Sequence, residues 1–322
     1  MMTSLRCQGE RLVRLAVFTG MNPRALIPAL TLAGLFLLAV GAGAAKWQQR
    51  DERELEHDGR TRTYVVRRPA NASAQAKLPV IIALHGGGGN AANVERMSGL
   101  TPFAHAKGVM VVYPNGTSGG GSNMLTWNAG RCCAYAMRNN VDDVGFLSKM
   151  IDQLVKNEGA DPRRIYVTGM SNGGMMTHRL AVEIGEKLAG AAPIAGALNS
   201  PLQAGSPVPI IMIHGTADEH VLLAGGQPKQ TLAGPRIDRS MQDGIDFWRE
   251  RNQASDEPTS KTEGRLTLTT YPGKNPVATA IIEGEGHTWP GGRAGSPRGD
   301  RPGQDVNANE LMWAFFSGLT PR

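Results

Sequence analysis

The chain has 322 residues, of which 41% are apolar and 19% are charged, so its length and composition allow a packed core and argue against disorder over most of the chain. The formal net charge is +6, but the basic residues do not gather into the clustered patch that a nucleic-acid interface needs, so we expect no nucleic-acid partner. The 41 glycines fall in many loops, which favours a fold whose function depends on backbone turns.

The first 45 residues differ from the rest of the chain. A basic start at Met21–Arg24 is followed by an apolar run that ends near Val40 and by the small residues Gly41–Ala45. This order is typical of a signal peptide with a small-x-small cleavage site. We therefore predict a signal peptide over residues 1–45, with Met21 as the alternative start, and a secreted or periplasmic protein without stable membrane association. Because the run approaches spanning length, a retained anchor is the competing interpretation.

Cysteine usage agrees with export. Cys7 lies in the leader, so the mature chain keeps only the adjacent Cys132 and Cys133. In an oxidising compartment the pair can form a vicinal disulfide, bridge to another chain or stay reduced, and we favour the vicinal bond. No Cys or His pair stands at ligand spacing, so we expect no metal site.

Short apolar runs alternate with helical patterns from residue 60 onward. Several runs are continuous rather than alternating, which is typical of parallel strands buried on both faces. Arg265–Tyr271 is expected to pair near the last strand of the sheet. The predicted strands are Tyr64–Arg67, Val80–Leu84, Val109–Tyr113, Ile165–Thr168, Ala191–Ala195, Pro209–Ile213, Arg265–Tyr271 and Thr279–Ile282.

Two helices stand out between and after these runs. Residues 140–157 carry an apolar stripe, with Asp142 and Asp143 in the first turn, where carboxylates favour the positive helix end; a capped packing helix accounts for both acids. A second amphipathic helix begins near Asp305. The alternation of strands and helices predicts one α/β domain over residues 46–322, with a mostly parallel central sheet and helices on both faces.

The segment VTGMSNGGMM at residues 167–176 places a serine between two glycines, where a predicted strand gives way to a helix. This is the G-x-S-x-G nucleophile elbow in its strand–turn–helix setting. Glycines flank the serine because a tight, strained turn leaves no room for a Cβ, and the start of the helix directs N–H groups toward a developing anion. We predict that Ser171 is a nucleophile.

A serine nucleophile needs a base, and the base needs an orienting acid. Folds with this elbow carry nucleophile, acid and histidine in that chain order. His287 follows the last predicted strand in a glycine-rich loop, at the strand end where ligand crevices open, and Asp218 follows the preceding strand. We predict them as base and acid. Glu219 is expected to be a solvated neighbour, and His214 and His220 are expected to shape the loop.

The segment LHGGGGNA follows another predicted strand. It matches the HGGG-type loop whose backbone N–H groups complete an oxyanion hole with the residue after the nucleophile. We therefore expect the donors to be Asn172 and either Gly86 or Gly87. A phosphate-binding loop is a poor alternative, because no Lys-Ser/Thr pair follows.

Two aromatic residues lie near these segments. Trp127 is part of MLTWNAGRCCAYA, which should rim the crevice, and Trp289 follows His287 closely. They are candidates for stacking on a substrate ring or for packing the loops, and the sequence favours neither. The triplet Arg298-Gly299-Asp300 resembles an adhesion tripeptide, which we attribute to coincidence.

With these residues in place, the chain resembles the secreted esterase family that groups polyhydroxybutyrate depolymerases with feruloyl esterases. The resemblance covers roughly residues 60–317 and implies an α/β-hydrolase fold with Ser171, Asp218 and His287 as the triad. Members act on polyester or its oligomers, or on feruloylated plant polysaccharide. It rests on LHGGGGNA, TWNAGRCCAYA, NVDDVGFL, GMSNGGMM, HGTAD and GHTWPGG in this order.

The expected function is that of an exported serine carboxylester hydrolase that works through an acyl-enzyme without a metal or organic cofactor. We see no added substrate-binding domain, so we expect a small-molecule or oligomeric ester rather than an insoluble granule. Two alternatives stay open: a peptidase with the same triad, and a catalytically inactive exported binding protein.

Overall fold

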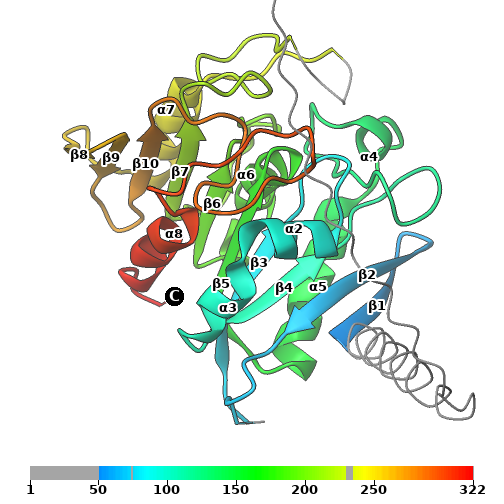
Figure 1. The fold of residues 1–322 in the computed structure, drawn as a ribbon. Coiled ribbons are helices and arrows are strands. Elements are labelled where there is room, and N and C mark those ends of the chain that lie inside the picture. The colour runs from blue at the N-terminus through cyan, green and yellow to red at the C-terminus, as the bar shows by residue number, and fades with distance from the viewer. Residues whose placement is uncertain (1–50, 74, 230–234, 322) are drawn as a thin grey trace, which may run out of the picture. The chain divides into compact units, whose positions relative to one another are not determined.

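A ten-stranded mixed sheet runs through the residues that the computed structural model describes, which are 51–73, 75–229 and 235–321 (Figure 1). The strand order is β1-β2-β4-β3-β5-β6-β7-β10-β9-β8. Neighbours from β4 to β10 pair in parallel, whereas β1-β2-β4 and β10-β9-β8 pair antiparallel. The predicted signal peptide lies outside the described residues.

Each of the eight predicted strands overlaps an observed one, and the strand predicted at Arg265–Tyr271 pairs with β10 as expected. β1 and β8 were not predicted, because they are edge strands with exposed, mostly polar residues and so lack an apolar run. The strands are β1 (Glu52–His57), β2 (Arg60–Arg67), β3 (Leu78–Leu84), β4 (Met110–Pro114), β5 (Ala160–Met170), β6 (Gly190–Ile194), β7 (Ile210–Gly215), β8 (Thr259–Glu263), β9 (Leu266–Tyr271) and β10 (Val277–Ile282).

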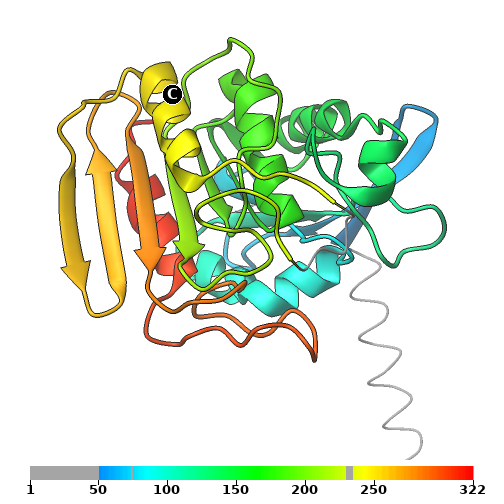
Figure 2. The same cartoon turned by 90° about the horizontal axis from the view of Figure 1, so that it is seen from above.

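Helices cover both faces of the sheet, as predicted (Figure 2). α5, α6 and α7 pack on one face, and α2, α3 and α8 pack on the other. α8 starts after the predicted Asp305, because the Asn307 side chain accepts from the N–H groups of residues 309 and 310 and so caps the helix. The helices are α2 (Ala91–Ser98), α3 (Leu100–His105), α4 (Ala134–Arg138), α5 (Asp143–Asn157), α6 (Asn172–Glu183), α7 (Met241–Asn252), α8 (Ala308–Ser317) and the 3₁₀ turn η1 (Gly185–Lys187). Along the described part of the chain, none of the helices combines the length and apolar character needed to cross a bilayer.

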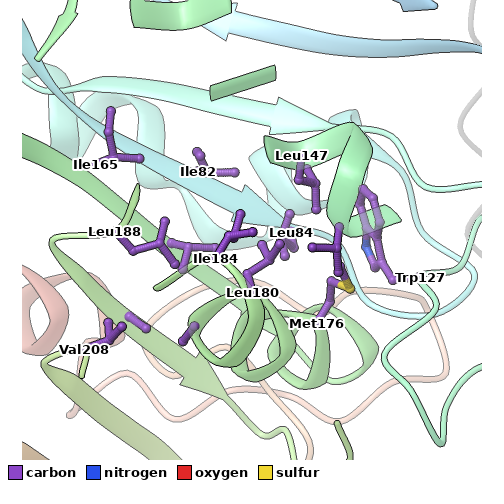
Figure 3. Packing of buried hydrophobic residues seen from close by; sticks show 14 of the residues in the cluster. Ile82, Leu84, Trp127, Leu147, Ile165, Met176, Leu180, Ile184, Leu188 and Val208 are labelled. Atoms are coloured by element: carbon purple, nitrogen blue, oxygen red, sulfur yellow. The ribbon is translucent and has the colours of Figure 1, made fainter. Parts of the chain in front are cut away.

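The central strands are buried on both faces, which explains their continuous apolar runs. In β3, Ile82 and Leu84 join the apolar cluster under α5 and α6, while Ile81 joins the cluster under α2 and α8. Figure 3 shows the first cluster, in which Leu147 of α5 and Leu180 of α6 close over the strands. Full burial of such a side chain contributes about 1.5–3 kcal/mol. This packing fixes the strand ends that carry the polar loops.

The two acids predicted at the start of α5 behave differently. Asp142 is the N-cap, whose side chain accepts from the Gly145 N–H at 2.9 Å, and it is half exposed. Asp143 is fully buried and pairs with Arg62 of β2 at 2.7 Å. The Arg62 guanidinium in turn lies 4.0 Å from the centre of the Phe146 ring. A capping role therefore describes Asp142, whereas Asp143 anchors α5 to the sheet.

This difference predicts unequal effects for the same substitution at neighbouring positions. Asp143→Asn leaves the buried Arg62 charge without its partner and should lower the free energy of unfolding by about 3–5 kcal/mol. Asp142→Asn keeps a good N-cap residue and should cost less than about 1 kcal/mol. Urea unfolding of both variants measures the difference, and equal losses would contradict the assigned roles.

Candidate active site

Ser171 occupies the turn between β5 and α6 with φ 58° and ψ −123°. A positive φ is uncommon for a residue other than glycine and holds about 1–3 kcal/mol of strain. The turn is secured on both sides, since Ser171 donates its N–H to the Ile194 carbonyl at 3.0 Å and accepts from the Met175 N–H at 2.8 Å. Its flanking Gly173 is required, because a Cβ there would collide with the Leu84 carbonyl oxygen. The serine therefore stands partly exposed at the carboxyl end of β5.

Asp218 and His287 follow β7 and β10, which run parallel to β5 and end at the same edge of the sheet. His287 Nδ1 lies 2.7 Å from Asp218 Oδ2. Burial opposes the charge on Asp218, but hydrogen bonds from His214 and His287 outweigh it, so the pKa of Asp218 lies below its ordinary value. A carboxylate can only accept, so His287 carries a proton on Nδ1, and a neutral ring then has Nε2 as an acceptor.

The structure brings the predicted acid and base into direct contact, but it does not join the base to the nucleophile. Among the described residues, the Ser171 hydroxyl makes no hydrogen bond, either to His287 or to another group. The His220 ring lies beside His287, with ring centres 5.0 Å apart. Catalytic hydrogen bonds are often long without substrate and tighten only in the reacting complex.

Sequence reasoning missed two acids that hold the His287 loop. Asp300 Oδ2 accepts from the His287 N–H at 2.7 Å. The buried Glu285 accepts from the Gly303 N–H at 3.0 Å and from the Thr288 hydroxyl. Asp300 belongs to the triplet that we attributed to coincidence, and its partner lies 13 residues away, so no local pattern could reveal the contact.

The loop after β3 approaches the nucleophile closely. A Cβ built on Gly86 would lie 3.5 Å from Ser171 Cβ. The Gly86 carbonyl accepts from His85 Nδ1 at 2.8 Å and from the Gly89 N–H at 3.0 Å, which fixes the plane of the following peptide. In a trans peptide the N–H points opposite to the C=O. The Gly87 N–H therefore faces away from these donors, and within the described residues it makes no hydrogen bond.

This geometry favours Gly87 over Gly86 as one oxyanion donor. The second candidate is the Asn172 N–H, which stands at the first position of α6, where a helix leaves N–H groups without intrahelical partners. A Cβ built on Gly87 would lie 3.7 Å from Asn172 Cβ, so the two backbones are neighbours. Both donors are thus available beside Ser171.

The Asn172 side chain supports the site from the interior. Its Oδ1 accepts from the Trp127 N–H at 2.8 Å, and its Nδ2 donates to the Trp127 carbonyl at 3.0 Å. Trp127 is 0% exposed and donates its indole N–H to the His85 carbonyl at 3.0 Å. Trp289 is 1% exposed and donates to Asn309 of α8 at 3.0 Å. In this structure both tryptophans therefore pack the loops, which is one of the two roles left open by the sequence.

Cys132 and Cys133 form the vicinal disulfide that we favoured. Both are buried, and the Cys133 N–H donates to the Trp127 carbonyl at 3.0 Å. The disulfide therefore belongs to the same buried support as Asn172. Among the described residues, no three His, Cys, Asp or Glu side chains are grouped so that they could hold a metal.

Two buried histidines lie beneath these loops. Burial lowers the pKa of His85 to about 4 and that of His178 to about 3. His178 Nδ1 accepts from the Trp248 indole at 3.1 Å, so the neutral ring is the form that the fold needs. The unfolded chain binds the proton below about pH 6.5, whereas the folded chain resists it until about pH 3–4, so stability falls on acidification between these values.

His178→Asn should weaken this pH dependence. The asparagine oxygen can take the place of Nδ1 as acceptor for Trp248, but it does not titrate. Between pH 7 and 5 the wild type should lose about 2 kcal/mol more unfolding free energy than the variant. Urea unfolding at both pH values measures this, and equal losses would show that His178 is not held neutral.

The chain is similar to known esterases. The sequence pattern of the phospholipase/carboxylesterase family matches residues 69–233. NocK of Nocardia uniformis subsp. tsuyamanensis, which is named as an esterase, is 31% identical over 260 residues that cover 74% of each chain. Feruloyl esterase B of Piromyces equi is 28% identical over 242 residues, which are 73% of this chain and 44% of that protein. This chain thus spans less than half of that relative.

Polyester depolymerases are also among the relatives. Poly(3-hydroxyalkanoate) depolymerase C of Paucimonas lemoignei is 35% identical over 132 residues, which cover 40% of this chain and 28% of that protein. These names confirm the resemblance drawn from the sequence motifs.

The fold is shared with a solved esterase. The acetyl xylan esterase from Aspergillus awamori superposes with a TM-score of 0.57 at 15% identity, over 83% of this chain and 98% of that chain. At this identity the likeness shows the fold alone. The chain therefore has the α/β-hydrolase fold and belongs to the phospholipase/carboxylesterase family.

Proposed function

We propose that the protein is a serine carboxylester hydrolase in which Ser171 is the nucleophile, His287 the base and Asp218 the orienting acid. One observation carries this proposal: the 2.7 Å bond between His287 and Asp218 lies at the same sheet edge as the strained turn of Ser171. A structural ion pair would not require the serine to hold a positive φ at the start of a helix. Family membership supports the same reaction class.

The reaction follows from the proton positions. Asp218 holds the Nδ1 proton, so His287 Nε2 takes the proton of Ser171 as Oγ attacks the ester carbonyl. The N–H groups of Asn172 and Gly87 donate to the resulting oxyanion. His287 then passes the proton to the departing alcohol, and the acyl group stays on the serine. Water, deprotonated by the same imidazole, releases the acid and restores the enzyme.

The substrate class is proposed from the relatives. Their names point to feruloyl esters, acetylated xylan and poly(3-hydroxyalkanoate). Because Trp127 and Trp289 are buried, neither indole offers a stacking surface for an aromatic acyl group. From the relatives we propose a soluble or oligomeric ester as substrate. Hydrolysis of different esters would identify the acyl group.

We also propose that the protein acts outside the cytoplasm. Two features support this: the signal-peptide pattern in residues 1–45 and the disulfide of Cys132 with Cys133, since disulfides persist in oxidising compartments. N-terminal sequencing of the protein from its producing cells should give a start just after the small residues Gly41–Ala45. A start at Met1 or Met21 would contradict cleavage.

Hydrolysis assays test the nucleophile. Methyl ferulate, 3-hydroxybutyrate oligomers and a short p-nitrophenyl ester should be compared, with Ser171→Ala as the blank. Removal of the serine hydroxyl should lower kcat by about 10⁶, so the blank should be silent on every ester that the wild type cleaves. If the wild type matched the blank on all of them, the esterase proposal would be wrong.

Two adjacent acids offer a matched test of the orienting role. Asp218→Asn removes the carboxylate and favours the wrong imidazole tautomer, so kcat should fall by about 10⁴. Glu219 is exposed, and Glu219→Gln removes one negative charge at the next position. This control should keep kcat within about 3-fold of the wild type, because surface charge changes have small effects. Similar losses in both variants would mean that the charge of the loop matters rather than the contact with His287.

A further inference from the structure

A second histidine contacts the acid of the site. We propose that His214 is a positioning residue of the triad, which donates its Nε2–H to the same carboxylate oxygen of Asp218 that His287 uses. This inference rests on the function proposed above. It differs from the sequence expectation, in which His214 only shapes the loop.

The position of the proton on His214 follows from its neighbours. His214 is the penultimate residue of β7, and its side chain is 3% exposed. Nε2 lies 2.8 Å from the Val221 carbonyl oxygen and 3.3 Å from Asp218 Oδ2. A carbonyl oxygen can only accept, so Nε2 carries a hydrogen. The Val221 carbonyl is therefore the main acceptor of this hydrogen, and the 3.3 Å approach of Nε2 to Asp218 Oδ2 is the contact in which we propose the second, weaker donation.

Three hydrogen bonds and the proposed His214 contact surround the carboxylate of Asp218. Oδ1 accepts from the N–H groups of His220 and Val221, each at 2.8 Å. Oδ2 accepts from His287 at 2.7 Å, and His214 Nε2 lies 3.3 Å from it. An ionised carboxylate offers about four such sites. With His214 as the proposed fourth donor, the carboxylate is held in one orientation, and the bond of His214 to the Val221 carbonyl ties the end of β7 to the loop.

Several titratable or charged groups of the described residues lie around His214 and Asp218. Arg236 donates to the His220 carbonyl of the same loop and pairs with Asp238. From α6, His178 is the titratable group that acts on it, and burial keeps His178 neutral by lowering its pKa to about 3. From its own loop, Asp218 is the charged partner, and beyond it lie His287 and the adjacent ring of His220. The influence of His214 on the base must therefore pass through Asp218.

This route has a chemical consequence. A second donor on Oδ2 draws part of the carboxylate charge away from His287. Without it, Asp218 would stabilise the protonated form of His287 more strongly. The base would then remain protonated, and the serine inactive, up to a higher pH. Loss of the His214 donor should therefore move the acid limb of the pH–rate profile upward.

Three substitutions separate this role from simple packing. His214→Phe keeps a ring and removes the donor. His214→Gln places an amide nitrogen at the same number of bonds from Cβ as Nε2, so it can donate to both Asp218 and Val221. His214→Asn carries the same amide one methylene shorter and should not reach. The measurement is kcat/KM for p-nitrophenyl acetate from about pH 5 to 9, normalised to sites labelled by a fluorophosphonate.

We expect His214→Phe and His214→Asn to shift the midpoint of the acid limb upward by about half a pH unit and to lower plateau kcat/KM by about 10-fold. His214→Gln should restore the wild-type midpoint and stay within about 3-fold of wild-type kcat/KM. An unchanged or lowered midpoint in both donor-free variants would overturn the proposal, as would an equal shift in all three. If His214→Phe does not fold, the difference in acid-limb midpoint between His214→Asn and His214→Gln tests the proposal.

The wild type separates this inference from the function on which it rests. If the wild type is labelled and active while the variants keep the wild-type midpoint of the acid limb, this result overturns only the role of His214. A wild type that is neither labelled nor active overturns the esterase function, and the role of His214 falls with it.

Discussion

The site depends on a backbone contact that is closer than any side chain would allow. The first turn of α6 lies directly against the end of β3, so a Cβ on Gly173 would be only 2.6 Å from the His85 carbonyl oxygen. On its other side, a Cβ on Gly174 would lie 2.7 Å from the Ile194 carbonyl oxygen of β6. This wedge between two strands forces the chain to leave β5 and enter α6 in one sharp turn. The positive φ of Ser171 is the consequence.

Buried polar contacts then transmit this position to the neighbouring loops. His85, Trp127 and Asn172 form a continuous hydrogen-bonded chain between the β3 loop, the disulfide loop and the start of α6. Because protein interiors are closely packed, such a chain holds the backbone donors more firmly than exposed contacts would. On the opposite side, Glu285 and Asp300 fix the loop of His287. The residues beneath the site therefore fix the positions of those proposed to react.

Much of this arrangement could be predicted from the sequence, because the relevant signals are local. A continuous apolar run such as Val80–Leu84 marks a central strand, and the G-x-S-x-G pattern marks the turn that follows one. The chain order of elements then places Asp218 and His287 at the same sheet edge as Ser171. The edge strand β1 escaped prediction, because its alternating polar residues need no buried face.

Contacts between distant segments could not be predicted in the same way. The choice between Gly86 and Gly87 could not be predicted either, because the local contacts of His85 and Gly89 fix a peptide plane that the residue pattern does not reveal. The burial of Trp127 depends on its contact with α6, and Asp300 meets His287 across a loop. The partners of Trp127 and Asp300 lie far away along the chain, so tertiary packing decides these two contacts.

Covalent labelling would show directly whether Ser171 is an activated nucleophile. The protein should be treated with a fluorophosphonate and digested, and the labelled peptide should be sequenced by mass spectrometry. Heat-unfolded protein treated in the same way is the unreactive control. We expect a single phosphonylated residue, Ser171, in the native protein, and no label after unfolding. An unlabelled native protein, or a label on another residue with Ser171 unmodified, would contradict it.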